Sequence, residues 1–356
     1  MNDIMEASRI IKPKDPLQLQ DIKTSTPRGS QILVKVESSG VCHSDIHLWE
    51  GGYKGPEGTF LKTTDRGVKY PLTPGHEIAG VIEELGEEAR EKFTKNDKVI
   101  VYPWIGEGLC PACIQGEENL CDKPQSLGVY QDGGYAEYVL VPSYRYLVKI
   151  SDNIEMDVAA TLSCSALTAY NAVRNAKLEP YHNLVIVGAG GLGLMAIQLA
   201  KAISGSRIIA LDLNDDKLNV AKKNGADIIL NTKKEDPIKS IKELTGNLGA
   251  DAVVDFVNST KSVETDMQLL RRRARLVLVG LFGGELKLNL ITMPTKSFTL
   301  IGSYTGTLNE LVGLLSLAER GVINPVITDK FKLDEATKAL SQLKEGNIIG
   351  RGVINP

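Results

Sequence analysis

The pattern of hydrophobic and polar positions changes twice along the chain. Over about the first 150 residues, short apolar runs alternate with polar residues and are separated by turns that contain glycine. This alternation is typical of strands with one buried face, and it predicts a barrel-like β region with few helices. The predicted strands lie at 31–40, 76–86, 97–104 and 133–141.

From about residue 165 to 300 the pattern becomes a regular alternation of apolar strands and amphipathic helices. Strands of this kind, separated by helical runs, predict a parallel, doubly wound sheet. We expect one helix to end within the arginines at 271–275, where the negative end of the helix dipole favours cations. The predicted strands are 183–188, 207–212, 227–230, 251–256 and 275–280, and the predicted helices include 192–204, 215–225 and 237–246.

The last part of the chain predicts two helices and a strand. Thr307 and Glu310 have the spacing of a capping box ahead of the apolar run that follows, and Gly321 is a suitable C-terminal stop. A second helix is expected at 334–346 and a terminal strand at 351–356.

Composition and charge exclude several classes of protein. Of the 356 residues, 42% are hydrophobic and 24% are charged, as in soluble proteins with two domains. A formal net charge of -3 gives no electrostatic reason to expect nucleic acid or anionic lipid as a partner. The longest uncharged apolar stretch, 184–200, is too short to span a membrane comfortably and contains four glycines. The N-terminus has no apolar run of signal-peptide length, so we expect a cytoplasmic protein.

The five cysteines are better explained by metal than by disulfides. Reducing compartments disfavour disulfides, and an odd number cannot pair completely. Cys110, Cys113 and Cys121 are clustered, with Glu107 three positions ahead of the first. A second set, Cys42, His76 and Cys164, offers two thiolates and an imidazole, which a catalytic zinc needs while a fourth position stays open. These three lie 34 and 88 residues apart, so spacing alone leaves their convergence open.

A glycine-rich turn predicts a dinucleotide site. The turn follows the strand 183–188 and opens the next helix, and Asp212 ends the following strand 19 residues after Gly193. Glycines let the backbone approach a pyrophosphate, while a carboxylate accepts hydrogen bonds from the ribose hydroxyls. Because that carboxylate would repel a 2′-phosphate, the sequence predicts NAD rather than NADP. The residues of the turn assigned to the cofactor are Gly188, Gly190, Gly191, Leu192 and Gly193.

The segment "GHEIAGVIEELGEEA" at 75–89 resembles the zinc signature of the medium-chain alcohol dehydrogenases, and the other motifs occur in that family's order. The resemblance covers the whole chain and is strongest to the microbial, including archaeal, tetrameric branch. It implies an α/β protein in which a GroES-like, β-rich catalytic domain (1–164 and 303–356) carries a structural zinc lobe at 105–122. A Rossmann domain with a doubly wound parallel sheet would occupy 165–302. A homotetramer is implied, with a homodimer as the alternative.

The resemblance also assigns two zinc sites per chain. It implies that Cys42, His76 and Cys164 bind the catalytic zinc, with Glu77 beside it as an occasional ligand. Asp45 would accept the other N–H of His76 and fix its tautomer. The structural zinc would be held by Glu107, Cys110, Cys113 and Cys121, although relatives carry a cysteine where Glu107 stands. A carboxylate is a harder, weaker partner for zinc than a thiolate, so a metal-free lobe is the alternative.

By the same resemblance, zinc acts as a Lewis acid while a hydride moves between NAD(H) and a primary or secondary alcohol, aldehyde or ketone. Ser44 would receive the proton and pass it through the cofactor ribose to His47. Further cofactor contacts are implied for His43, Thr168, Lys217, Val279 and Arg351.

The substrate pocket is less defined. Trp49, Tyr53 and Trp104 are expected to line it, with packing in the core as the alternative. Residues 51–71 read as a long loop with four basic and two acidic residues, which indicates either an acidic aldehyde or a solvated loop face. A zinc-free quinone reductase is disfavoured by the cysteine and histidine set. A non-catalytic protein is disfavoured by that set together with Asp212.

Overall fold

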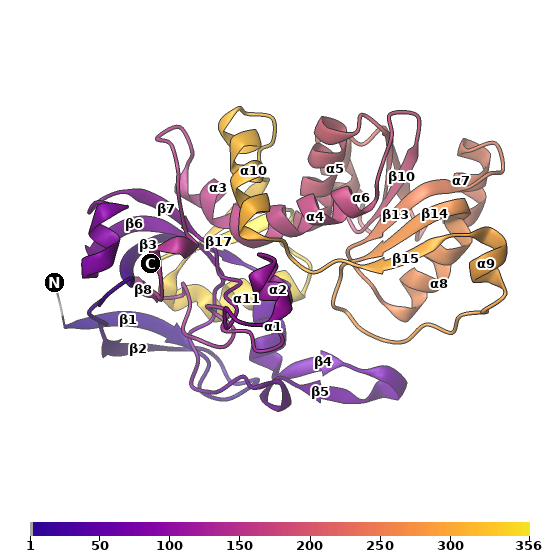
Figure 1. The fold of residues 1–356 in the computed structure, drawn as a ribbon. Coiled ribbons are helices and arrows are strands. Elements are labelled where there is room, and N and C mark those ends of the chain that lie inside the picture. The colour runs from indigo at the N-terminus through magenta and orange to yellow at the C-terminus, as the bar shows by residue number, and fades with distance from the viewer. Residues whose placement is uncertain (1–2) are drawn as a thin grey trace.

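The computed structural model describes residues 3–356, and it contains one β-rich part and one α/β part (Figure 1). The β-rich part is built on a seven-stranded sheet with the order β16-β17-β3-β6-β7-β9, and β8 pairs with β3. The four strands predicted in the first third are all present, and they are β3, β6, β7 and β8. The bounds are Ile32–Val41 (β3), Glu77–Leu85 (β6), Lys98–Val101 (β7), Tyr138–Val141 (β8), Leu147–Lys149 (β9), Ile327–Lys332 (β16) and Arg351–Asn355 (β17). A separate hairpin joins β1 (Ile4–Arg9) to β2 (Gln18–Lys23).

The C-terminal segment returns to the first sheet. Strand β17 pairs antiparallel with β3 and parallel with β16, so the last strands of the chain join the sheet that the first third of the chain builds. The two helices predicted in this segment are confirmed as α10 (Leu308–Glu319) and α11 (Ala336–Lys344). Thr307 and Glu310 form the expected capping box on α10.

The α/β part is a six-stranded, fully parallel sheet with the order β12-β11-β10-β13-β14-β15. This is the order of a dinucleotide-binding doubly wound fold. Its strands are Asn183–Val187 (β10), Arg207–Asp212 (β11), Ile228–Asn231 (β12), Ala250–Asp255 (β13), Leu270–Leu278 (β14) and Thr299–Gly302 (β15). Its helices are Gly191–Ile203 (α5), Asp215–Lys223 (α6), Pro237–Leu244 (α7), Thr260–Leu269 (α8) and Thr292–Lys296 (α9).

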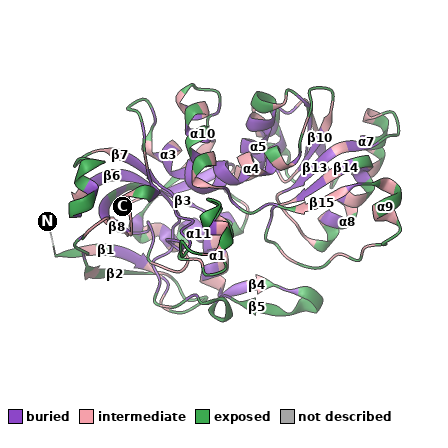
Figure 2. Ribbon diagram, viewed as in Figure 1, coloured by how far each residue is buried: buried purple, intermediate pink, exposed green. Residues whose placement is uncertain are grey.

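Successive side chains of the central strand β10 enter different cores. Leu184 and Ile186 belong to a core that also contains residues of the β-rich part, whereas Val185 packs in a second core on the other face of the sheet. The central strands β10, β11 and β13 of the α/β sheet are buried along most of their length (Figure 2). Burial on both faces explains the continuous apolar runs in the sequence.

A continuous helical run joins the two parts. Helix α3 (Met156–Thr161) passes through a π-helical turn, Leu162–Ala166, into α4 (Leu167–Asn175). The predicted division at 164/165 falls inside this run.

Two expectations about local structure were wrong. Helix α8 ends at Leu269, and the arginines at 271–275 belong to strand β14, where Ala274 and Leu276 are buried in the sheet. The segment 51–71 is not one long loop, because β4 (Gly52–Lys54) and β5 (Phe60–Lys62) form an antiparallel hairpin. Within residues 3–356, no helix combines the length and apolar character that crossing a membrane requires.

Candidate active site

A cavity of about 340 Å³ lies where the two parts meet, and it collects most of the predicted site residues. Helix α1 (His43–Glu50), the π turn, the glycine-rich turn and the start of β17 all contribute to its lining. The predicted cofactor residues in the lining are His43, Thr168, Gly188, Gly190, Gly191, Leu192, Gly193, Asp212, Lys217, Val279 and Arg351. Cys42, Ser44, His47, Trp104 and Cys164 line the same cavity.

Four potential metal ligands converge beside this cavity. One ligand atom each from Cys42, His76, Glu77 and Cys164 lies within 4.8 Å of all the others, and all four residues are buried. They come from the start of α1, the start of β6 and the π turn. Among the described residues, the Nε2 atom of His76 has no hydrogen-bond partner although it is buried. A buried ring nitrogen facing two thiols fits a zinc ion.

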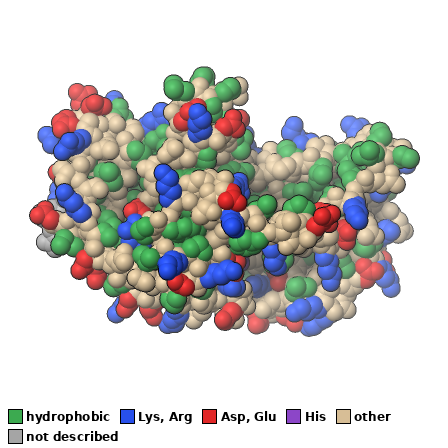
Figure 3. Space-filling model, turned by 90° about the horizontal axis from the view of Figure 1, so that it is seen from below, with side chains coloured by type: hydrophobic (Ala, Val, Ile, Leu, Met, Phe, Trp, Pro, Cys, Tyr) green, Lys and Arg blue, Asp and Glu red, His purple; other side chains and the backbone are tan. Residues whose placement is uncertain are grey.

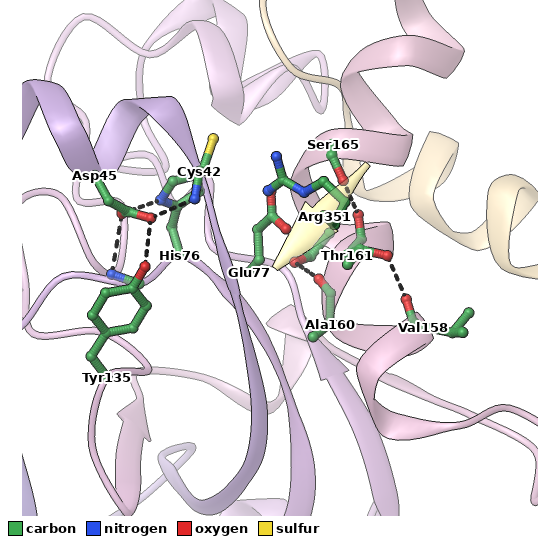
Figure 4. Close-up of polar contacts among 12 residues, drawn as sticks. Cys42, Asp45, His76, Glu77, Tyr135, Val158, Ala160, Thr161, Ser165 and Arg351 are labelled. Atoms are coloured by element: carbon green, nitrogen blue, oxygen red, sulfur yellow. Dashed lines mark hydrogen bonds and ion pairs between the residues drawn. The ribbon is translucent and has the colours of Figure 1, made fainter. Parts of the chain in front are cut away.

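Asp45 fixes the orientation of His76. Its Oδ1 lies 3.1 Å from His76 Nδ1, while its Oδ2 accepts hydrogen bonds from the Cys42 N–H at 3.0 Å and the Tyr135 hydroxyl at 3.1 Å (Figure 4). A carboxylate on Nδ1 favours the tautomer that keeps the proton there, which leaves Nε2 free to bind a metal.

The electrostatics of the cluster also favour a cation. The hydrogen bond with Cys164 holds the pKa of the Cys42 thiol well below its usual range, and the same contact raises the pKa of Cys164. Burial lowers the pKa of His76, but the charges of Asp45 and Cys42 outweigh it and raise that pKa well above the usual value. Buried negative charge is costly without a compensating cation, and a bound metal would supply one.

Glu77 forms a buried ion pair with Arg351 on β17 (Figure 4). Burial raises the pKa of Glu77 to about 7, although the Arg351 guanidinium opposes the shift. Its Oε2 has no partner among the described residues. The pair links the metal cluster to the cofactor end of the cavity, since Arg351 also lines that cavity.

Asp212 is held at the end of β11 and faces the glycine-rich turn. Its Oδ2 accepts the N–H of Ala189 at 2.7 Å, and its Oδ1 accepts the N–H of Leu213 at 2.7 Å. Close packing requires the glycines, because a Cβ on Gly193 would lie 1.9 Å from the carbonyl oxygen of Gly188. This local arrangement suits a pyrophosphate and a ribose.

Ser44 and His47 lie one turn apart on α1, and both line the cavity. Burial lowers the pKa of His47, so its ring is mostly neutral near pH 7 and able to accept a proton. The His47 ring packs at 4.5 Å from the ring of Tyr53, between ring centroids.

The lobe at 105–122 brings three of its four predicted ligands together. Cys110, Cys113 and Cys121 have sulfur atoms within 4.8 Å of one another. Glu107 is exposed and outside this group, and only its backbone N–H contacts a ligand, Cys121 Sγ, at 3.3 Å. Glu107 as the fourth ligand therefore stays a prediction.

Glu118, which no sequence motif marks, is the buried acid of this lobe. Its Oε2 accepts hydrogen bonds from the Gly106 N–H at 3.0 Å and the Tyr146 hydroxyl at 2.8 Å, and it pairs with Arg145. These contacts tie the lobe to the body of the β-rich part.

One predicted pocket residue lies elsewhere. Trp49 lines neither the large cavity nor a smaller one beside it; its ring packs against buried residues such as Phe331 and Leu48, and its indole N–H donates to the Asp15 carbonyl at 2.7 Å. It is half-buried at the edge of the core, because α11 packs against α1. Tyr53 and Trp104 do line the smaller cavity, together with Tyr304, which no motif marks in the sequence.

A doubly wound nucleotide-binding sheet joined to a β-rich part with two cysteine clusters defines a two-domain, metal-binding dehydrogenase. Comparison with known proteins agrees: residues 28–152 match the alcohol dehydrogenase GroES-like domain, and residues 191–320 match the zinc-binding dehydrogenase family. The chain belongs to the zinc-containing medium-chain alcohol dehydrogenase family. The predictions of family, fold class, enzyme class and of zinc and NAD as cofactors are thereby confirmed.

Three similar proteins illustrate the relationship. An NAD-dependent alcohol dehydrogenase of Sulfurisphaera tokodaii is 45% identical over 99% of this chain and 100% of its own length. A D-arabinose 1-dehydrogenase (NADP(+)) of Saccharolobus solfataricus is 32% identical over 99% of this chain and 97% of its own. The crystal structure of the alcohol dehydrogenase from the archaeon Aeropyrum pernix superposes with a TM-score of 0.89 at 34% identity, covering 99% of this chain and 100% of that one.

Proposed function

We propose that this protein is an NAD-dependent zinc alcohol dehydrogenase that interconverts primary or secondary alcohols with aldehydes or ketones. The observation that carries the proposal is the buried cluster of Cys42, His76 and Cys164 opening into the cavity that the glycine-rich turn also lines. A metal cluster and a nucleotide turn in one cavity bring a Lewis acid and a hydride carrier to the same substrate.

The chain's own residues would divide the work as follows. Cys42, His76 and Cys164 hold the zinc, which when bound supplies a Lewis acid for the substrate oxygen. Asp45 keeps the proton of His76 on Nδ1 through its 3.1 Å contact. Glu77 is neutralised by Arg351, which leaves it beside the metal rather than as a permanent ligand.

Proton transfer would be carried out by α1. The Ser44 hydroxyl takes the proton of the alcohol, and His47 exchanges a proton with solvent. Support comes from the position of both side chains in the cavity and from the lowered pKa of His47.

NAD would be selected over NADP by Asp212, whose carboxylate lies in the cavity lining at the end of β11. We further propose the domain division 1–164 and 303–356 against 165–302, and a second, structural zinc in the lobe at 105–122. A homotetramer is proposed from the resemblance.

The test is the purified protein assayed against a panel of alcohols, with D-arabinose included, using NAD and NADP side by side and zinc measured in the same sample. We expect alcohol oxidation with NAD and about two zinc per chain. Activity on D-arabinose alone, or a preference for NADP, would contradict the proposal.

A further inference from the structure

A second cavity of about 160 Å³ adjoins the catalytic cavity. Ser44, Trp104, Leu281 and Tyr304 line both of them, so the two share walls rather than lying apart. A substrate whose reacting carbon lies beside Ser44 would extend its other end into this second cavity, which we call the outer cavity.

The two ends of the outer cavity differ: one is buried beside the metal cluster and the other is open to solvent. Trp104 is buried, and its ring centroid lies 5.3 Å from that of His76, so it marks the metal end. The ring of Tyr304 follows at 5.8 Å from that of Trp104. Arg66 lines the outer cavity and is solvent-exposed, which marks the opposite, open end.

Arg66 is the single charged side chain among the described residues that line the outer cavity. Within residues 3–356 Arg66 forms no ion pair, although the segment 51–71 also contains the acids Glu57 and Asp65. The other polar side chains of the lining are neutral: the indole of Trp104 and the hydroxyl-bearing residues Ser44, Tyr53, Thr63, Tyr130 and Tyr304. A cation surrounded by hydroxyls and apolar walls suits a carboxylate.

The local structure holds Arg66 in place. It ends a short 3₁₀ turn, Thr64–Arg66, which Gly67 terminates at φ 92. The turn is anchored because the Thr63 hydroxyl lies 3.0 Å from the Tyr70 hydroxyl, which donates to the Leu48 carbonyl at 2.7 Å. The guanidinium carbon lies 5.5 Å from the centroid of the Tyr53 ring. Contact with an aromatic ring orients a guanidinium and leaves its N–H edges free for an acid.

We propose that Arg66 is a specificity-determining residue that binds the carboxylate of the substrate, and that the substrate class is short aliphatic ω-hydroxy acids and the corresponding ω-oxo acids. This inference rests on the proposed function and narrows it. The apolar side chains of the outer cavity contact the aliphatic carbons, the hydroxyl oxygen faces the metal cluster, and the carboxylate pairs with Arg66 at the open end.

The test compares two substrate series in the zinc-loaded enzyme with NAD: short ω-hydroxy acids and the n-alcohols of equal carbon number. For wild type, kcat/KM should be higher for the acids. Arg66→Ala should lower kcat/KM for the acids about 10- to 100-fold, as expected for loss of a charge-assisted hydrogen bond, and leave the n-alcohols within about twofold. Arg66→Lys should retain part of the preference, since it keeps the charge without the planar edge.

Lys69→Ala is the matched control, because Lys69 is an exposed cation of the same segment that does not line the outer cavity. It should leave the preference unchanged. An equal loss in Lys69→Ala and Arg66→Ala would show a general electrostatic effect and overturn the inference. Oxidation of n-alcohols without any preference for the acids would overturn the inference alone, whereas oxidation of neither series would overturn the proposed function as well.

Discussion

Among the acids outside the catalytic cavity, Asp266 on α8 has the pKa that is raised furthest from its ordinary value. It is 1% exposed, and its Oδ2 has no hydrogen-bond partner among the described residues. Burial, together with the nearby Asp255 carboxylate, raises the pKa of Asp266 to about 10. Asp255 itself accepts the N–H groups of Val257 and Asn258, which begin the loop beside the cofactor cavity. Asp266 is therefore protonated at neutral pH and can donate to Asp255.

A raised pKa makes this acid a source of pH-dependent instability. Below about pH 4, near the pKa of Asp266 in the unfolded chain, this group does not reduce the free energy of unfolding. As the pH rises from about 4 toward about 10, its pKa in the folded protein, the free energy of unfolding falls. Asp266→Asn keeps a hydrogen-bond donor and does not titrate. We expect the melting temperature of the variant to exceed that of wild type by a margin that grows between pH 5 and pH 9. Melting curves at several pH values test this, and a constant difference would contradict the assignment.

His47 should set the acid limb of activity. Because burial lowers its pKa, the ring becomes protonated only below its ordinary value near 6.5. Alcohol oxidation should therefore fall as the pH drops through a midpoint below 6.5. His47→Gln should abolish this limb and lower kcat about 10²- to 10⁴-fold. An unchanged pH profile in the variant would remove His47 from proton transfer.

Most residues that line the site could be identified from sequence motifs. Whether a given side chain faces the site, the core or solvent could not be predicted from the sequence. Motifs singled out Cys42, His76 and Cys164 because few residue types bind zinc. They could not show that Glu107 is exposed or that Trp49 is covered by α11, since both depend on packing between distant segments. In the sequence, Arg66 is one of four basic residues in the segment 51–71, and no motif distinguishes it from the others.

At the scale of elements, periodic segments were predicted well and irregular ones poorly. Strands such as β3 and β10 and helices such as α5 and α10 carry clear periods, and all are present. The helix end predicted within 271–275 was wrong because cations are favoured at the C-terminal end of a helix, and the same arginines also occur in the strand β14. The hairpin β4–β5 is too short to show a period. It projects from the body with β5 exposed (Figures 1 and 2).

The lobe at 105–122 should depend on its metal. Leu109, Ile114 and Leu120 point to solvent, so the lobe buries little apolar surface of its own, and metal binding should supply much of its folding energy. Cys113→Ser should lose one zinc per chain and melt at a lower temperature than wild type. Zinc analysis with melting curves, before and after chelator, tests this.

The same measurements decide the role of Glu107. Glu107→Ala should release that zinc more readily if the carboxylate is the fourth ligand, with Glu117→Ala, an exposed acid of the same lobe, as control. Equal zinc retention in the two variants would show that Glu107 is not a ligand.

At the scale of the whole molecule, the site depends on contacts between distant parts of the chain. The cavity is lined by residues from Cys42 to Arg351, and no local pattern gives their separation in space. The family resemblance supplied what spacing could not. On the outside, acidic and basic side chains are interspersed on the face seen from below, with apolar side chains in small groups between them (Figure 3).

Metal and cofactor binding should be separable, because different parts of the chain carry them. Cys42→Ala should abolish alcohol oxidation and lower zinc content by about one per chain. NADH binding should change little, since Asp212 and the glycine-rich turn lie on the other sheet. Fluorescence titration with NADH, beside the activity assay, measures both. Normal turnover by the variant would contradict the zinc assignment.

The helical run from Met156 to Asn175 carries residues of both predicted sites, that of the metal and that of the cofactor. Cys164 in the π turn and Thr168 in α4 are four residues apart, about one helical turn, and both face the cavity. One helical run thus carries a predicted metal ligand and a predicted cofactor contact about one turn apart. If the two parts of the molecule rotate to admit substrate, Cys164 and Thr168 move together, because both lie on this helical run. The distance between the metal site and this end of the cofactor site would then stay the same in the open and the closed molecule.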